Sequence, residues 1–241
     1  MGYINNIHPQ MGVWGPSDAK ARGFFICMPR NVSFFIDGFN LYHSVCDALD
    51  RNLIRHGKWL DLRRLCTRYL YLFGHNARLQ DIFYFSAFAY HARDPEAPER
   101  HDQLIQAFQA MGVKTVMGRF KKKQIKCRAK CKQTSWGYEE KETDVNIAVH
   151  LIEELANKTC DIAVIVSGDT DLSAAVKVAK RMFPSQLIAC AFPYGRSKGR
   201  SELKNLCDRY FNIEPEAYQH FQLPDQITLA NGYIVKKPPM W

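Results

Sequence analysis

Short apolar runs alternate along most of the chain with segments in which apolar residues recur at helical spacing. Apolar runs that end at Gly, Pro, Asn or Asp are typical of strands buried on both faces of a sheet. They predict strands at 31–40, 81–90, 113–120, 161–169 and 186–192, with an edge strand at 209–213. Apolar spacing of three and four positions is typical of amphipathic helices. Such segments lie at 41–49, 62–73, 98–111, 141–156, 170–182 and 200–207.

Local start and stop signals support this assignment. Asp61 is placed to cap the helix at 62–73, and Gly74 follows it. Asp is favoured at a helix N-cap because its side chain accepts a backbone N–H, and Gly is favoured just after a helix. Strands that alternate with helices form βαβ units, so the sequence predicts an α/β fold with a mainly parallel sheet.

The 241 residues suffice for one domain with extensions. Residues 1–29 lack periodicity, so we expect a poorly ordered N-terminal extension, with Met28 as the effective start. Residues 30–213 are predicted to form the domain, with a basic insertion, a hairpin or loop, at about 119–138. Residues 214–241 are rich in Pro and are predicted to wrap on its surface as a C-terminal extension.

The net charge is +9, and the basic residues are concentrated in two stretches. Eight of them, and no acidic residue, lie from Arg119 to Lys132, and a second cluster begins at Arg196. Clustered charge of this kind indicates a phosphate-contacting surface. The candidate nucleic-acid-binding residues are Lys121, Lys122, Lys123, Lys126, Arg128, Lys130, Arg196, Lys198 and Arg200. Nearby, Trp136 and Tyr138 either stack on unpaired bases or clip the hairpin together.

Four aspartates stand where the predicted sheet would gather them. Asp37 ends the first strand, and Asp169 and Asp171 lie just past the "IAVIV" run of the strand predicted at 161–169. Asp144 lies in the first turn of the helix at 141–156. Helix capping alone would explain Asp144 or Asp171. The carboxyl ends of parallel strands share one edge, where ligands bind, and a carboxylate there is costly unless solvated, paired or bound to a cation. A shared cation explains the four together better.

Carboxylates without Cys or His select hard cations, so we expect Mg²⁺ or Mn²⁺ rather than Zn²⁺. A water bound to such an ion has a lowered pKa and can attack a phosphodiester, and a second ion could stabilise the leaving oxygen. The sequence thus predicts metal-dependent phosphodiester hydrolysis, with Asp37, Asp144, Asp169 and Asp171 as both catalytic and metal-binding residues.

Three motifs carry a resemblance that adds the substrate class: "FFIDGFNLYHSV", "EEKETDVNIAVHL" and "VIVSGDTDLSAAV". In this order they resemble the NYN domain family of PIN-like ribonucleases, over roughly residues 30–213. The resemblance implies a three-layer α/β/α PIN-like domain that cuts RNA, single-stranded or structured, with the four aspartates as its metal site. It also implies that Asn40 supports the site by hydrogen bonding and that Ser167 contacts a metal-bound water or phosphate.

The cysteines and histidines give weaker signals. Cys66, Cys160 and Cys190 lie in apolar segments and are expected to be small hydrophobes of a cytoplasmic protein. Cys127 and Cys131 form one pair without a second pair at zinc-site spacing, so zinc is disfavoured. His43 and His150 have packing or surface roles as their simplest explanation. No apolar run reaches the roughly 18–20 residues that cross a bilayer.

Other functional classes fit less well. A haloacid-dehalogenase-like phosphatase needs a second Asp two residues after the first, but Gly38, Phe39 and Asn40 follow Asp37. A nucleotide-binding dehydrogenase needs a G-x-G-x-x-G that is absent after the first strand. The serious alternative is a non-catalytic RNA-binding or scaffold protein that keeps the PIN-like fold. The sequence leaves open DNA as a substrate, the mode of cleavage, the RNA sequence preference and the number of metals, and it is compatible with a homodimer.

Overall fold

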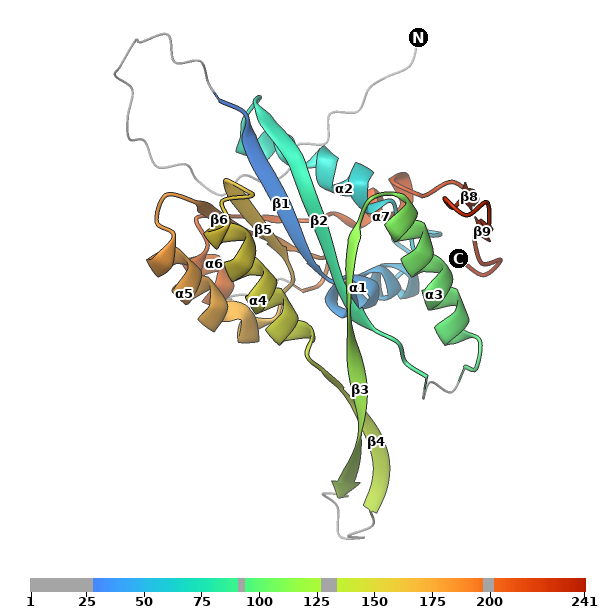
Figure 1. Cartoon of the computed structure of the whole chain (residues 1–241). Coiled ribbons are helices and arrows are strands. Elements are labelled where there is room, and N and C mark those ends of the chain that lie inside the picture. Colours follow the sequence, from blue (N-terminus) through green and yellow to red (C-terminus); the bar gives the residue numbers. More distant parts are fainter. Residues whose placement is uncertain (1–27, 91–93, 127–133, 197–201) are drawn as a thin grey trace, which may run out of the picture.

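The computed structural model describes residues 28–90, 94–126, 134–196 and 202–241. Its centre is a seven-stranded sheet in the order β4-β3-β2-β1-β5-β6-β7 (Figure 1). The strands are β1 (Arg30–Asp37), β2 (Ala77–Ala87), β3 (Lys114–Lys126), β4 (Thr134–Lys141), β5 (Ile162–Val166), β6 (Leu187–Phe192) and β7 (Arg209–Asn212). Neighbouring strands are parallel except β3 and β4, which are antiparallel. The predicted, mainly parallel sheet is confirmed.

Helices cover both faces of the sheet. The first face carries α1 (Gly38–Asp50), α2 (Leu62–Arg68), α3 (Ala97–Ala110) and α7 (Pro215–His220). The second carries α4 (Thr143–Ala156), α5 (Ser173–Met182) and α6 (Glu202–Leu206). Two short 3₁₀ helices are η1 (Leu70–Phe73) and η2 (Thr170–Leu172). This three-layer α/β/α arrangement is the one expected of a PIN-like domain, so the predicted fold class is confirmed.

The central strands are apolar throughout because each contributes to two cores. In β1, Phe34 and Ile36 pack toward α1 and α2, whereas Phe35 packs toward α4 and α5. Every residue of β5 is buried. Strand side chains alternate between faces, so a strand covered on both sides has no polar face. This is the physical origin of the continuous apolar runs in the sequence.

Local signals set some boundaries, and packing sets others. Asp61 caps α2 as predicted, because its side chain accepts the backbone N–H of Arg64 at 3.0 Å. The helix ends at Arg68, however, and the rest of the predicted segment at 62–73 is the 3₁₀ helix η1.

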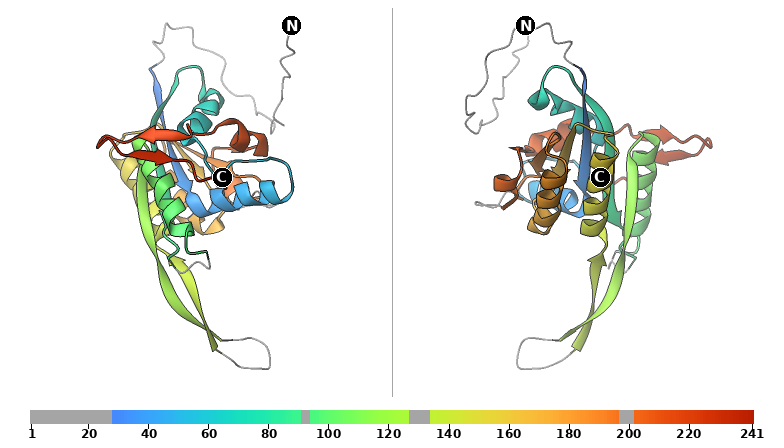
Figure 2. Two further views of the ribbon diagram at one scale, coloured as in Figure 1. Left: turned by 90° about the vertical axis from the view of Figure 1, so that its right-hand side faces the viewer. Right: turned by 60° about the vertical axis from the view of Figure 1, so that its left-hand side comes forward.

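The basic insertion is a hairpin, in which β3 continues past the predicted end at 120 to Lys126 and pairs with β4. Figures 1 and 2 show this hairpin projecting beyond the helical layers. Residues 1–27, for which a poorly ordered extension is predicted, lie outside the described residues.

The C-terminal segment contains α7 and a small antiparallel pair, β8 (Gln226–Thr228) and β9 (Ile234–Lys236). Tyr218 and Val235 of this segment are buried in the core on the α1 side, so it packs into the domain as well as over it. Among the described residues, no helix combines the length and apolar composition that a bilayer span needs.

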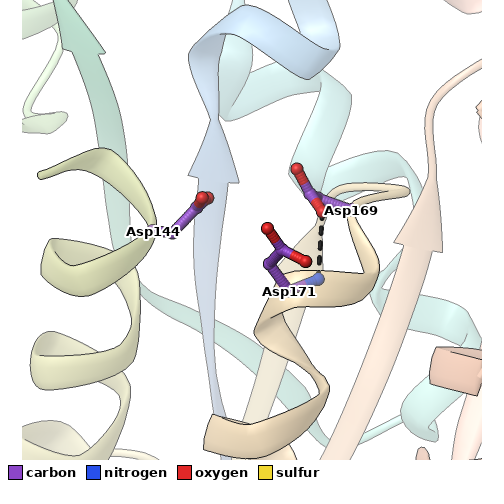
Figure 3. Close-up of side chains that lie close together, drawn as sticks. All are labelled: Asp144, Asp169 and Asp171. Atoms are coloured by element: carbon purple, nitrogen blue, oxygen red, sulfur yellow. Dashed lines mark hydrogen bonds between the residues drawn. The ribbon is translucent and has the colours of Figure 1, made fainter. Parts of the chain in front are cut away.

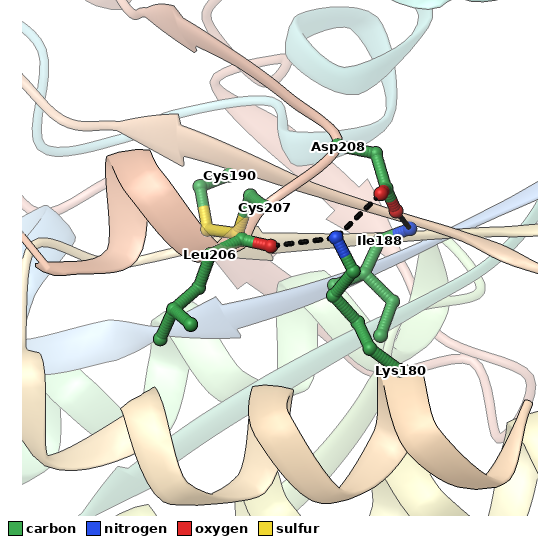
Figure 4. Close-up of a disulfide and its surroundings, with 6 residues drawn as sticks. All are labelled: Lys180, Ile188, Cys190, Leu206, Cys207 and Asp208. Atoms are coloured by element: carbon green, nitrogen blue, oxygen red, sulfur yellow. Dashed lines mark hydrogen bonds and ion pairs between the residues drawn. A yellow bond between two sulfur atoms is a disulfide. The ribbon is translucent and has the colours of Figure 1, made fainter. Parts of the chain in front are cut away.

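The cysteine expectation is right in part. Cys66 and Cys160 are buried free thiols, as expected of small hydrophobes. For Cys190 the expectation is wrong, because its sulfur is bonded to Cys207 (Figure 4). The pairing arises because the chain after α6 returns beside β6, with the two Cα atoms 6.2 Å apart. Cys127 and Cys131 lie outside the described residues.

Candidate functional site

The pairing of β1 with β5 brings two of the predicted site segments together. The parallel register ends with Ile36 opposite Val166. The next residues, Asp37 and Ser167, are therefore neighbours at the carboxyl end of the sheet. The Ser167 hydroxyl donates a hydrogen bond of 2.8 Å to Asp37 Oδ2. Strand order thus converts two distant motifs into one site.

Asp37 is both the end of β1 and the N-cap of α1. Its Oδ1 accepts the backbone N–H of Asn40 at 2.9 Å. A Cβ on Gly38 would lie 2.6 Å from the carbonyl oxygen of Phe85, so this tight turn needs glycine. Burial raises the pKa of Asp37, the bonds from Asn40 and Ser167 lower it, and the charge of Asp169 raises it further.

Asn40 and Ser167 hold the loop that follows β5. Asn40 Oδ1 accepts the backbone N–H of Gly168 at 3.0 Å, and Ser167 Oγ accepts that of Asp169 at 3.0 Å. Gly168 allows a close approach, because a Cβ there would lie 2.4 Å from the carbonyl oxygen of Arg196. The Ser167 side chain is fully buried, so its hydroxyl is engaged within the protein.

Asp169 and Asp171 come from the turn into α5. Asp169 caps η2, where its Oδ1 accepts the backbone N–H of Asp171 at 3.0 Å. Figure 3 shows both side chains directed toward Asp144 on α4. Each of these three carboxyl groups offers one oxygen atom, and the three atoms lie within 4.8 Å of one another.

The entry to α4 places Asp144. Glu142 adopts a left-handed backbone conformation, with φ of 82°, directly before the helix. Glu140 Oε1, on β4, accepts the backbone N–H of Thr143 at 3.1 Å and also bonds the Thr143 hydroxyl. A side chain outside the helix thus satisfies one of its first N–H groups. The end of the hairpin and the start of α4 are thereby fixed beside the aspartates.

The carboxyl groups repel one another. Burial, together with the charges of Asp169, Asp37, Glu140 and Asp171, raises the pKa of Asp144 to about 6. In the described part of the chain, no ion pair joins Asp37, Asp144, Asp169 or Asp171 to a basic side chain. The cluster therefore carries negative charge that the described residues do not pair directly.

The four predicted aspartates occupy two different positions in the site. Asp144, Asp169 and Asp171 share the grouping described above, whereas Asp37 lies deeper, with both oxygens accepting hydrogen bonds from the protein. Asp37 still borders the same pocket as Asp144 and Asp169, a hollow of about 360 Å³. The complete lining is Asp37, Phe39, Asn40, His43, Phe120, Glu140, Thr143, Asp144, Asp169 and Arg196.

Several lining residues were not among the predicted site residues. Glu140 belongs to an acidic run that precedes the helix, but only the β3–β4 register brings it to the pocket. Phe39 and Phe120 pack edge to face, with ring centroids 5.7 Å apart. His43 reaches the pocket, whereas the ring of His150 packs against Phe83 and Phe85 in the core.

The predicted nucleic-acid-binding residues fall into four groups. Arg196 lines the pocket, and its Nη2 donates at 2.6 Å to Asp47 Oδ2, which lies outside the pocket lining. Exposed side chains on β3 form the second group: Lys121, Lys122 and Lys123. Lys126 is the last residue of β3. Arg128, Lys130, Lys198 and Arg200 lie outside the described residues.

Comparison with known proteins agrees with the fold and with the family resemblance. The sequence model of the NYN domain matches residues 31–214. The fold is similar to the crystal structure of a protein of unknown function, VPA0982, from Vibrio parahaemolyticus, with a TM-score of 0.51 and 16% sequence identity. The likeness covers 82% of this chain and 98% of that chain. No curated protein matched the sequence. The chain belongs to the NYN domain family of PIN-like ribonucleases.

Proposed function

We propose that this protein is a metal-dependent ribonuclease that hydrolyses RNA phosphodiester bonds at the aspartate pocket. The observation that carries the proposal is the meeting of Asp144, Asp169 and Asp171, whose oxygen atoms lie within 4.8 Å of one another. Three carboxylates held this close repel one another unless a proton or a cation lies between them. The match to the NYN family, a family of nucleases, supports a bound cation over a shared proton.

The donor set fits Mg²⁺ or Mn²⁺. All the grouped donors are carboxylate oxygens, which hard divalent cations prefer, and neither Cys nor His belongs to the group. A cation at this position would also lower the raised pKa of Asp144, because it would offset the charges of the neighbouring carboxylates. When bound, such an ion supplies Lewis acidity toward the phosphodiester and lowers the pKa of a bound water.

The other residues of the pocket have positioning and binding roles in this proposal. Asp37 joins β1, α1 and the Ser167 hydroxyl, so it fixes the floor of the pocket. Asn40 fixes the loop that carries Asp169 through its bond to Gly168. Arg196 lines the same pocket, and its guanidinium is held by Asp47 beside it. A guanidinium there suits a phosphate oxygen of the substrate.

RNA is the substrate class for two reasons. The family is associated with RNA processing. The hairpin that borders the pocket also carries exposed Lys121, Lys122 and Lys123, which suit a polyanion. The basic balance of the chain, with a net charge of +9, favours the same class of partner.

The direct test is cleavage of labelled single-stranded RNA with Mg²⁺, with Mn²⁺ and with a chelator. We expect cutting by the wild type in either metal, none in chelator, and a loss on the order of a thousandfold in Asp37→Asn and Asp169→Asn. Asp225→Asn is a matched control, because Asp225 is an exposed carboxylate at β8, outside the pocket lining.

Equal cutting by the two variants and the wild type would contradict the proposal. RNA binding without cutting in either metal would instead support the non-catalytic alternative. Folding of each variant is verified by its circular dichroism spectrum, so that an inactive variant is not mistaken for an unfolded one.

A further inference from the structure

The β3–β4 hairpin has two different faces. In an antiparallel pair, residues directly opposite each other project to the same face, and the face alternates along the strand. Three such pairs on one face are Phe120 with Glu140, Lys122 with Tyr138, and Gln124 with Trp136. Three alternate pairs project to the opposite face: Arg119 with Lys141, Lys121 with Glu139, and Lys123 with Gly137. We call these the aromatic face and the charged face.

The aromatic face begins inside the aspartate pocket. Phe120 and Glu140 both line the pocket, together with Asp144 and Asp169. Trp136 lies four residues before Glu140 on β4, a distance of roughly 13 Å along a strand. Figures 1 and 2 show the hairpin continuing away from the helical layers. A polymer that leaves the pocket along this face therefore meets Tyr138 and then Trp136.

Two aromatic rings on this face, those of Trp136 and Tyr138, are exposed to solvent. Trp136 is 62% exposed and Tyr138 is 45% exposed, although both lie within a strand. The ammonium group of Lys122 lies 4.5 Å from the centroid of the Trp136 ring. Since the hairpin projects beyond the helices, its outer part does not pack these rings into either core cluster. Exposed flat rings, one of them with a cation close to it, suit an unpaired base with its phosphate.

The charged face is unlike it. Glu139 accepts ion pairs from Lys123 at 2.9 Å and from Lys141 at 3.1 Å. Two of its lysines are thus already paired within the hairpin. The combination of stacking surface and cation occurs on the aromatic face, which is also the face continuous with the pocket. Charge and continuity therefore both favour a nucleic acid as the occupant.

We propose that the aromatic face of the hairpin stacks the bases of single-stranded RNA that leaves the aspartate pocket, and so selects unpaired RNA as the substrate. In a duplex the bases are stacked on each other and paired, so they cannot lie on Trp136 and Tyr138. This inference rests on the proposed function, since it names the substrate of the same pocket.

The test is RNA binding in chelator, followed by fluorescence anisotropy, so that the result does not depend on cleavage. The probes are a labelled single strand of about 16 nucleotides, within the range bound by single-strand-binding folds, and a duplex of the same length. We expect Trp136→Ala to weaken binding of the single strand by about tenfold or more and to leave the duplex nearly unchanged. Trp136→Phe keeps an aromatic ring and should retain most of the affinity.

Tyr71→Ala is the matched control. Tyr71 is 52% exposed on η1, and its ring also lies beside a cation, with the Arg68 guanidinium carbon 5.6 Å from the centroid. The Tyr71→Ala variant should bind both probes with the affinity of the wild type.

Unchanged binding of the single strand by Trp136→Ala would overturn the inference. An equal loss for both probes would also overturn it, because that result indicates a ring that only holds the hairpin together. Either result leaves the proposed function standing if the wild type cuts RNA. Conversely, selective loss of single-strand binding in a protein that does not cut would contradict only the proposed function.

Discussion

The two ends of the central sheet use aspartate in opposite ways. At the amino-terminal end, Asp208 directly precedes β7. Its carboxylate accepts a hydrogen bond of 2.6 Å from the Lys180 ammonium group and one of 2.9 Å from the backbone N–H of Ile188 (Figure 4). Asp161 precedes β5 and accepts the backbone N–H of Asn31 at 2.7 Å. Each of these carboxylates is separate from the other and has a partner within the protein.

At the carboxyl-terminal end, Asp144, Asp169 and Asp171 face one another. Among the described residues, no basic side chain forms an ion pair with them. A carboxylate with its own partners holds the fold together. A group of carboxylates that raises the pKa of its own members lowers apoprotein stability and is suited to an added cation. The contrast separates structural aspartates from candidate functional ones in a single sheet.

Among substitutions that test this contrast between the two ends of the sheet, the largest expected effect is on RNA cleavage. Replacement of Asp144 by Asn should reduce the cleavage rate at saturating Mn²⁺ on the order of a thousandfold, because it removes a proposed metal ligand. Asp161→Asn is the counterpart at the other end, and an amide oxygen there can still accept the N–H of Asn31. The RNA cleavage rate of Asp161→Asn should stay within about threefold of the wild-type rate. Similar losses in both variants would remove the distinction between the two ends.

Metal should stabilise the protein only through the carboxyl-terminal end. Ligand present at a hundred times its dissociation constant stabilises a folded protein by about 2.7 kcal/mol, which for a chain of this size raises Tm by about 5–10 °C. We expect this shift in wild type with Mn²⁺ and little or none in Asp169→Asn, as measured by thermal unfolding. The Asp208→Asn variant should start from a lower Tm but show the full shift. A full rise of Tm with Mn²⁺ in the Asp169→Asn variant would show that the metal binds at another place.

The pH dependence of stability should also differ between the ends. The pKa of Asp144 in the folded protein is about 6, above its ordinary value of 3.8. Without metal, its contribution to stability is therefore present below about pH 4 and is lost as the pH rises through 6. In chelator, the Tm of the wild type should therefore fall relative to that of Asp144→Asn as the pH rises from about 4 to above 6. A flat difference would contradict the raised pKa.

Manganese should reverse the trend, because the cation competes with the proton on Asp144. Its affinity should therefore rise with pH until Asp144 is ionised, above about pH 6. Calorimetric titration with Mn²⁺ at several pH values measures this directly. An affinity that does not change between about pH 5 and about pH 7, roughly one unit either side of the Asp144 pKa, would exclude Asp144 as a ligand.

The smallest expected effect concerns the hairpin lysines. Neutralising Lys121, Lys122 and Lys123 together should weaken RNA binding and reduce its salt dependence, with the slope of log K against log salt falling by about 0.7 for each lost phosphate contact. Lys122→Gln should account for more of this change than Lys123→Gln, since Lys123 is already paired with Glu139. An unaltered slope in the triple variant would indicate a solubilising hairpin only.

Much of the architecture follows from the sequence because its signals are local. The buried runs of β1 and β5, the cap at Asp61 and the placing of Asp37 and Asp169 at strand ends need only periodicity and parallel pairing. The proximity of these two aspartates follows from the rule that parallel strands end at one edge.

Other features depend on contacts that local pattern does not contain. Glu140 reaches the pocket through the register of a hairpin whose β3 strand carries consecutive lysines, which hide the two-residue alternation. The Cys190–Cys207 bond depends on the return of the chain after α6. The burial of Tyr218 in the C-terminal segment likewise depends on packing against α1, where its hydroxyl meets Ser44 Oγ at 2.8 Å.

The most direct measurement of the central claim is the anomalous difference density of crystals soaked in Mn²⁺ above about pH 7, where the Asp144 carboxyl is ionised. We predict a peak within coordination distance of Asp144, Asp169 and Asp171, and no peak in crystals of Asp169→Asn. Wild-type crystals with no peak at this position, or with manganese only at another place, would contradict a metal centre at the carboxyl-terminal end of the sheet.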